Sequence, residues 1–207
     1  MKCFTLTDML IVMAILTVLM SLFVSSVEIN QEKADLRICS ENLHQIYRLQ
    51  EQYLMDSDGM YPSAYVNRGK GKTWDMALDF YGDVESKDIY ACPSDADIND
   101  RTRSYALNDG GRGSWASEIL ERMRGLGNEK GLSNHQSVVR KPDQFIAFAE
   151  LPGTKSLRAN KSHAGTHALD TYQGAGVHGE ADKIMTVMSC GHTEFMSAEN
   201  AAERQKH

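Results

Sequence analysis

The most reactive side chains of this sequence are four widely spaced cysteines: Cys3, Cys39, Cys92 and Cys190. No two of them have the close spacing of a zinc ribbon or a thioredoxin site. In an exported protein, an oxidising compartment lets the last three form one disulfide. We predict a Cys92–Cys190 bond, because both residues would flank strands and Cys190 stands where a hairpin turn usually has another residue. Cys39 is then a buried thiol; buried free thiols throughout are the alternative.

Groups that can bind zinc lie in the C-terminal part of the chain: His163, His167, His178, Cys190 and His192. His163 and His167 are four residues apart, a spacing that places two ligands on one face of a helix. Their segment, SHAGTHALDTYQGAG, is interrupted by glycines and is typical of a loop. We therefore predict exposed loop histidines and one structural histidine in a hairpin, rather than a zinc site.

A run of acidic and amide side chains has the composition of a calcium loop: Asp95, Asp97, Asn99 and Asp100. An EF-hand needs Gly at its sixth position and Glu at its twelfth, where this chain has Asp100 and Ala106. The segment is therefore not an EF-hand. We predict a solvated acidic turn and no cofactor, with an irregular calcium site as the alternative.

Catalytic motifs are missing from the sequence: there is no nucleophile elbow, Walker loop, dinucleotide fingerprint or spaced carboxylate pair. A net charge of −6 argues against nucleic acid as the partner, because phosphate binding needs a basic face. We predict that the chain is not an enzyme. The alternative is a membrane-anchored, metal-dependent enzyme or a ligand-binding ectodomain that uses the C-terminal His/Cys loop.

Asp8 is the unusual residue of the N-terminal segment. Every residue from Met9 to Val24 is apolar except Thr17 and Ser21, and extension back to Phe4 gives a helix of about 30 Å, the thickness of a bilayer core. An aspartate at the centre of a membrane helix costs about 2.5–3.5 kcal/mol. Asp8 should therefore lie near an edge, be paired, or serve a function.

Three interpretations of this segment compete. A secretory signal peptide could end at Val24-Ser25-Ser26, but only Lys2 supplies positive charge ahead of the apolar run. A plain signal anchor leaves Asp8 unexplained. The third interpretation is that Asp8 pairs with a positive charge during assembly. Lys2 alone before the run favours an orientation with the N-terminus inside and the rest of the chain exported.

The stretch FTLTDMLIVMAILTVL resembles the N-terminus of type IV pilins and of the pseudopilins of type II secretion. The resemblance implies a leader, residues 1–3, that a prepilin peptidase removes between Cys3 and Phe4, where the family usually has Gly before the cut. It also implies a methylated N-terminus at Phe4 and an acid at the fifth mature position, which is Asp8. The new amine and Asp8 would pair within or between subunits.

The segment ADLRICSENLHQIYRLQEQYLMDSDGMYPSAY resembles the continuation of one branch of these proteins. CPSD at residues 92–95 and the later SY-x-x-N resemble the same branch. That branch ends its head with a His, nine intervening residues and then Asp-Gly-His. Here eleven residues separate His178 from Cys190-Gly191-His192. The matching residues of the first segment are Cys39, Asn42, Leu43, Gln45, Ile46, Tyr53, Asp58, Gly59, Tyr61 and Pro62.

The elements that would position these residues begin with one long helix. No Gly or Pro precedes Gly59, so a helix can run from Phe4 to about Met55 and stop at DSDG. Its second half has an apolar stripe spaced by threes and fours: Leu36, Cys39, Leu43, Ile46, Tyr47, Tyr53 and Leu54. In the head we predict helices at 73–81 and 115–124, a strand at 144–151, and a hairpin of 183–189 with 192–196.

Together these features predict an α+β, pilin-like fold. The expected parts are a leader (1–3), a transmembrane or filament-core helix (4–26), the amphipathic half of that helix (27–56) and a globular head (57–207). The resemblance implies a filament subunit of the inner membrane whose head lies in the periplasm or in an extracellular filament. Its implied partners are like or different pilin subunits, the membrane, the peptidase and an assembly ATPase.

Overall fold

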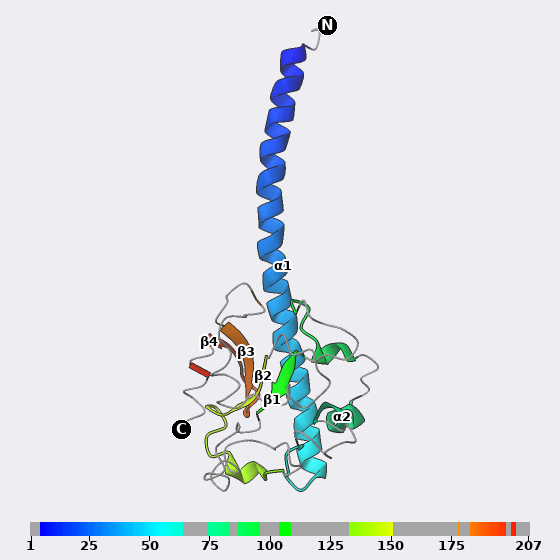
Figure 1. The fold of residues 1–207 in the computed structure, drawn as a ribbon, viewed down its shortest axis with the longest axis vertical. Helices are drawn as coiled ribbons and strands as arrows, with labels where there is room; N and C mark the ends of the chain where they lie inside the picture. The colour runs from blue at the N-terminus through cyan, green and yellow to red at the C-terminus, as the bar shows by residue number, and fades with distance from the viewer. Residues whose placement is uncertain are drawn as a thin grey trace, which may run out of the picture.

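The computed structural model describes residues 5–63, 74–82, 87–95, 104–108, 133–150, 178, 183–197 and 200–201, without the side chains of 23–29 and 87–88. The fold is α+β: one long helix carries a small head built on a four-stranded antiparallel sheet (Figure 1). The predicted helix at 115–124 lies outside the described residues.

Helix α1, Leu6–Asp56, has 51 residues and is about 77 Å long. It begins with a capping box: the Thr5 side chain accepts the Asp8 backbone N–H, and the Thr5 N–H donates to Asp8 Oδ2 at 2.9 Å. It ends at Asp56, and the chain then turns through Asp58 and Gly59, whose φ values of 51° and 74° are left-handed. The predicted long helix and its stop at DSDG are confirmed.

The sheet has the order β1-β2-β3-β4 and every neighbouring pair is antiparallel. The predicted strand and hairpin are confirmed as β2, Ile146–Glu150, and as β3, Lys183–Met188, with β4, Thr193–Ser197. β1, Tyr105–Leu107, was not predicted, because three residues are too few to show an alternating pattern.

The second half of α1 packs on one face of the sheet. Cys39, Leu43 and Ile46 are fully buried there, in one cluster with Phe148 and Val187 of the sheet. The predicted apolar stripe is therefore confirmed as a core contact. The opposite face of the sheet holds a smaller buried cluster: Ala106, Ile146, Ala149, Ile184, Met188, Met196 and Ala201.

A short helical segment covers the head beside α1. It consists of α2, Trp74–Leu78, and the 3-10 turn η1, Asp79–Tyr81, in agreement with the helix predicted at 73–81. The Trp74 ring is the anchor: its centroid lies 5.0 Å from that of Phe148 and 5.7 Å from that of Tyr90. Trp74 thereby joins this segment to the sheet.

The first half of α1 stands clear of the head (Figure 1). Large apolar side chains between Leu6 and Leu22 are 48–80% exposed in the single chain. Among the helices that the structure describes, none has the length and apolar character that crossing a membrane requires. The predicted span at 4–26 includes Phe4 and the side chains of 23–26, which lie outside the description.

The turn between β3 and β4 differs from the expected one. The Met188 N–H donates to the His192 carbonyl at 2.8 Å, and the Gly191 N–H donates to the Met188 carbonyl at 2.9 Å. Gly191 has φ +84°, so the loop has three residues, typical of a turn followed by a glycine bulge. Cys190 consequently needs no positive φ, and its presence is compatible with this turn type.

This turn contacts the face of α1 that carries Ser40, His44 and Tyr47. The Ser40 and Thr193 hydroxyls are 2.9 Å apart, His44 Nδ1 is 3.3 Å from the Gly191 carbonyl, and the Tyr47 hydroxyl donates to the Ser189 carbonyl at 3.3 Å. The contacts fix the distance between the hairpin and the helix, which leaves no room for a side chain at Gly191.

Gly191→Ala should destabilise the head by about 1–3 kcal/mol, because the residue is left-handed and its new Cβ would lie 2.8 Å from Tyr47 Cε1. Urea unfolding followed by circular dichroism measures the change. Gly82→Ala is the matched control, since Gly82 has φ −109°, which any residue adopts. Equal stability losses in both variants would contradict this account of the turn.

Candidate functional site

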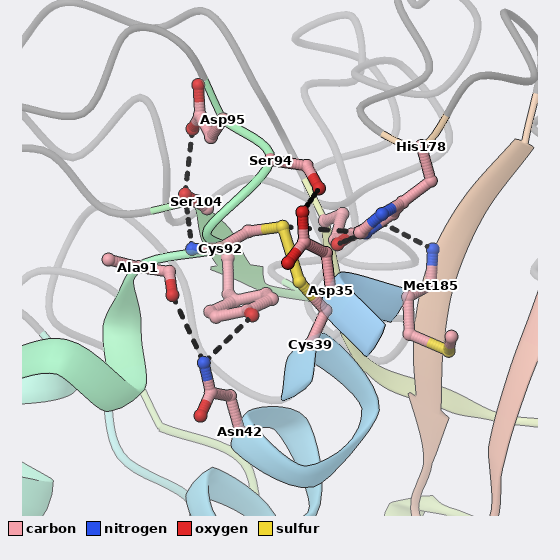
Figure 2. Close-up of polar contacts among 12 residues, drawn as sticks. Asp35, Cys39, Asn42, Ala91, Cys92, Ser94, Asp95, Ser104, His178 and Met185 are labelled. Atoms are coloured by element: carbon pink, nitrogen blue, oxygen red, sulfur yellow. Dashed lines mark hydrogen bonds and ion pairs between the residues drawn. A yellow bond between two sulfur atoms is a disulfide. The ribbon is translucent and has the colours of Figure 1, made fainter. Parts of the chain in front are cut away.

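Four side chains that can bind a metal or exchange electrons meet in the core of the head: Cys39, Cys92, Glu150 and His178. Cys39 comes from α1, Cys92 from the segment after the 3-10 turn η2, Lys87–Tyr90, Glu150 from the end of β2, and His178 from the chain before β3. Figure 2 shows Cys39, Cys92 and His178 pointing toward one another. Their exposed fractions are 0–2%, so the site is closed to solvent.

The disulfide joins Cys39 to Cys92, with 5.4 Å between their Cα atoms, and Cys190 is a free, exposed cysteine. The predicted Cys92–Cys190 bond is therefore wrong. Cys39 lies on the buried stripe of α1, directly against Cys92, whereas Cys190 is at the exposed tip of the hairpin. The bond ties the helix to the head across a sequence separation of 53 residues.

A buried contact between His178 and Glu150 lies beside the sulfur atoms. His178 Nε2 is 2.9 Å from Glu150 Oε1 and 3.4 Å from Cys92 Sγ. The Met185 backbone N–H donates to Glu150 Oε2 at 2.8 Å, so each carboxylate oxygen has a partner. The Phe195 ring meets His178 edge to face, at 6.1 Å between centroids, and holds the imidazole in place. Burial of the carboxylate is tolerable because these partners offset its charge.

The segment around Cys92 is held by polar side chains. Asn42 Nδ2 donates to the Ala91 carbonyl at 3.1 Å, and the Cys92 N–H donates to Ser104 Oγ at 2.9 Å. The Ser94 hydroxyl donates to Asp35 Oδ2 on α1 at 3.2 Å. These bonds, drawn in Figure 2, place the Cys92 sulfur opposite Cys39.

The acidic run predicted as a calcium alternative is described only in part. Asp95 is buried, its carboxylate accepts the Ser104 hydroxyl at 2.7 Å, and its N–H donates to the Cys92 carbonyl at 3.0 Å. Asp95 is therefore not the solvated residue that we expected, because it stabilises the turn after Cys92. Asp97, Asn99 and Asp100 lie outside the described residues.

Tyr105 of β1 borders the site. Burial raises the pKa of its phenol, and the negative charge of Glu150 raises that pKa further, while the Asn42 amide, which donates to the phenol oxygen at 3.4 Å, opposes the shift. The phenol therefore stays protonated at neutral pH and adds no second negative charge near Glu150.

The other residues that the sequence suggested are separate from this site. His192 is exposed next to the hairpin turn, so the pairing of His178 with His192 in a metal site is not observed. Asp8 is exposed at the far end of α1, in the capping box with Thr5. Cys3, Phe4, His163 and His167 lie outside the described residues.

Sequence reasoning missed Glu150 altogether. The available signal was an acid at the end of QFIAFAEL, an otherwise apolar strand, where a buried carboxylate needs a partner. The prediction of a structural histidine in the hairpin is wrong, because His192 of the hairpin is exposed. The buried histidine is His178, which precedes β3. The sequence did not indicate which cysteines lie next to His178, because that depends on the rotation of α1 against the sheet.

Removing the disulfide with Cys39→Ala and Cys92→Ala should lower the free energy of unfolding by about 4 kcal/mol, because the bond closes a loop of 53 residues. Urea unfolding of the full chain measures it, with Cys190→Ser as a control of near-zero effect. A peptide map without reductant that links Cys190, instead of Cys39, to Cys92 would contradict the structure.

His178→Ala should cost about 3–5 kcal/mol, because it leaves Glu150 buried without its partner. The double variant His178→Ala, Glu150→Ala should cost clearly less than the sum of the two single changes, since the unpaired charge is then gone. Thermal unfolding of the four proteins completes the cycle. Additive losses would show that the two side chains do not interact.

No protein-family model, curated protein or solved structure matches the chain. Inferences about its function therefore depend on its own residues and their arrangement.

Proposed function

We propose that this chain is a structural subunit of a pilin-like filament, assembled through the first half of α1. The observation that carries the proposal is a single helix in two environments. From Cys39 to Leu54 it is packed in the head, and from Leu6 to Leu22 its apolar side chains have no partner within the described part of the chain.

The exposed segment is apolar on every side. Met9 to Met13 are five consecutive large apolar residues, and five consecutive positions go more than once around a helix of 3.6 residues per turn. A helix that is apolar all round is buried against other helices or in lipid. Burying a side chain of this size contributes about 1.5–3 kcal/mol, so covering a dozen of them supplies a large driving force for association.

Copies of the same helix are the partner that we propose for this surface. Helices that pack side by side through unlike faces make heterologous contacts, which generate a helical filament when the rotation between copies does not close a ring. Asp8 then lies among apolar side chains of neighbouring copies. Its carboxylate needs a positive partner there, and the amine of Phe4, created by removal of residues 1–3, is one helical turn away.

The residues that carry the resemblance to pilin-like heads also support the proposal. They are far apart in the sequence, yet Cys39 and Asn42 contact Cys92 and Ala91, and His178 lies against Cys92. A shared set of residues that builds one buried cluster is what a common head fold requires. The residues that resemble the pilin-like branch therefore lie together in the core of this head, which supports the proposal.

Export of the head follows from the same proposal. A disulfide forms and persists in oxidising compartments such as the bacterial periplasm. We propose that the chain is held at the inner membrane before assembly, with its head in the periplasm, and that a prepilin peptidase and an assembly ATPase act on it. The enzyme alternative, which uses the C-terminal His/Cys loop, has less support, because His178 is buried.

Asp8→Asn should prevent incorporation into filaments, because the amide cannot neutralise the amine of a mature N-terminus. The head should keep its thermal stability, since Asp8 is exposed at the far end of α1. Sedimentation and electron microscopy of sheared filaments measure incorporation. Glu32→Gln is the matched control: it removes one exposed carboxylate from the same helix and should assemble normally.

N-terminal sequencing of the assembled protein complements this test, and the expected first residue is a methylated Phe4. Equal loss of assembly in the Asp8 and Glu32 variants would indicate a general charge effect. A mature chain that begins at Met1 or at Val27 would overturn the proposal, because the amine could not then lie next to Asp8.

A further inference from the structure

We propose that Cys39, Cys92, Glu150 and His178 form a structural zinc site when the Cys39–Cys92 disulfide is reduced. Each residue offers one ligand atom, two sulfurs, one imidazole nitrogen and one carboxylate oxygen, and all four atoms lie within 4.8 Å of one another. The site is separate from the helix surface proposed for assembly, and neither proposal depends on the other.

The size of the cluster suits a tetrahedral ion. Zinc binds sulfur at about 2.3 Å and nitrogen or oxygen at about 2.0–2.2 Å, so its ligands lie roughly 3–4 Å from one another. His178 Nε2 already lies 3.4 Å from Cys92 Sγ and 2.9 Å from Glu150 Oε1. Breaking the sulfur–sulfur bond lets the two sulfurs separate to the distance that a shared metal ion sets.

The donor types select the metal. Thiolate and imidazole favour zinc and similar transition metals over calcium and magnesium, which take oxygen ligands. Two thiolates and one carboxylate carry three negative charges, of which zinc neutralises two. The Met185 N–H, which donates to Glu150 Oε2 at 2.8 Å, orients the carboxylate so that Oε1 faces the cluster, as an outer-shell partner does at metal sites.

The imidazole has the matching orientation. Nε2 points at the sulfur and the carboxylate, whereas Nδ1 is buried without a hydrogen-bond partner among the described residues. A neutral imidazole that binds metal through Nε2 carries its proton on Nδ1. The Phe195 ring holds this orientation from the side.

The disulfide and the metal exclude each other, because zinc binds thiolates. A dithiol reductant supplies two electrons and two protons, the Cys39–Cys92 bond breaks into two thiols, and the reductant becomes a disulfide. Zinc then forms two Zn–S bonds and displaces two protons to solvent. In the reverse direction a disulfide oxidant takes up the two electrons and the ion is released.

The expected role of the ion is to hold the head together. The four ligands come from α1, the segment after η2, β2 and the chain before β3, and they fill a tetrahedral site with no position left for substrate. Zinc would therefore join α1 to the head as the disulfide does. A newly made, reduced chain could then fold before it is oxidised.

The test uses the full chain, unfolded and reduced with a dithiol, then refolded without oxygen after the dithiol is removed. Zinc added against a competing chelator should bind one ion per chain and raise the melting temperature. Cobalt(II) should give the absorption bands of a tetrahedral thiolate site. The disulfide form of the same protein should bind neither ion.

Matched variants decide whether these four residues are the site. Glu150→Gln and His178→Ala should weaken zinc binding by more than the 10–100-fold that loss of an outer-shell partner costs. Cys190→Ser and His192→Ala remove an exposed cysteine and an exposed histidine and should leave binding unchanged. Absence of stoichiometric binding by the reduced wild-type chain, or loss of binding in the Cys190 and His192 variants, would overturn the proposal.

Discussion

Packing of the second half of α1 on the sheet is the contact on which the other features of the head depend. Cys39, Leu43 and Ile46 are buried against the sheet core, and this contact sets the rotation of the helix. The rotation brings Cys39 to Cys92 and Asn42 to the Ala91 carbonyl. The adjacent helix face holds the β3–β4 turn through His44 and Tyr47.

The two halves of α1 differ in how their apolar residues are distributed around the helix, although they form one continuous helix. The half inside the head has an apolar stripe and a polar face, as a helix on a globular surface needs. The half outside the head is apolar on every side, which suits burial among other helices or in lipid. The helix has no Gly or Pro, where sharp kinks usually occur, so the two halves are continuous.

The interior of the head is unusual because it holds an ionisable pair next to a disulfide. A buried carboxylate is costly unless it is paired and fully hydrogen-bonded. Here His178 and the Met185 N–H satisfy both oxygens of Glu150, and Tyr105 keeps its proton beside them. The Glu150 side chain therefore connects β2 to β3 and to the chain at His178.

The sequence alone determined the long helix, its stop, strand β2 and the β3–β4 hairpin, because these features depend on neighbouring residues. Apolar spacing marks the buried stripe, and Asp58 and Gly59 accept the left-handed conformations that end a helix. Only the tertiary structure decided which cysteines bond, that Asp95 is buried, and that Glu150 meets His178. Those outcomes depend on the rotation of α1 and on the order of strands, which bring together residues that no local pattern connects.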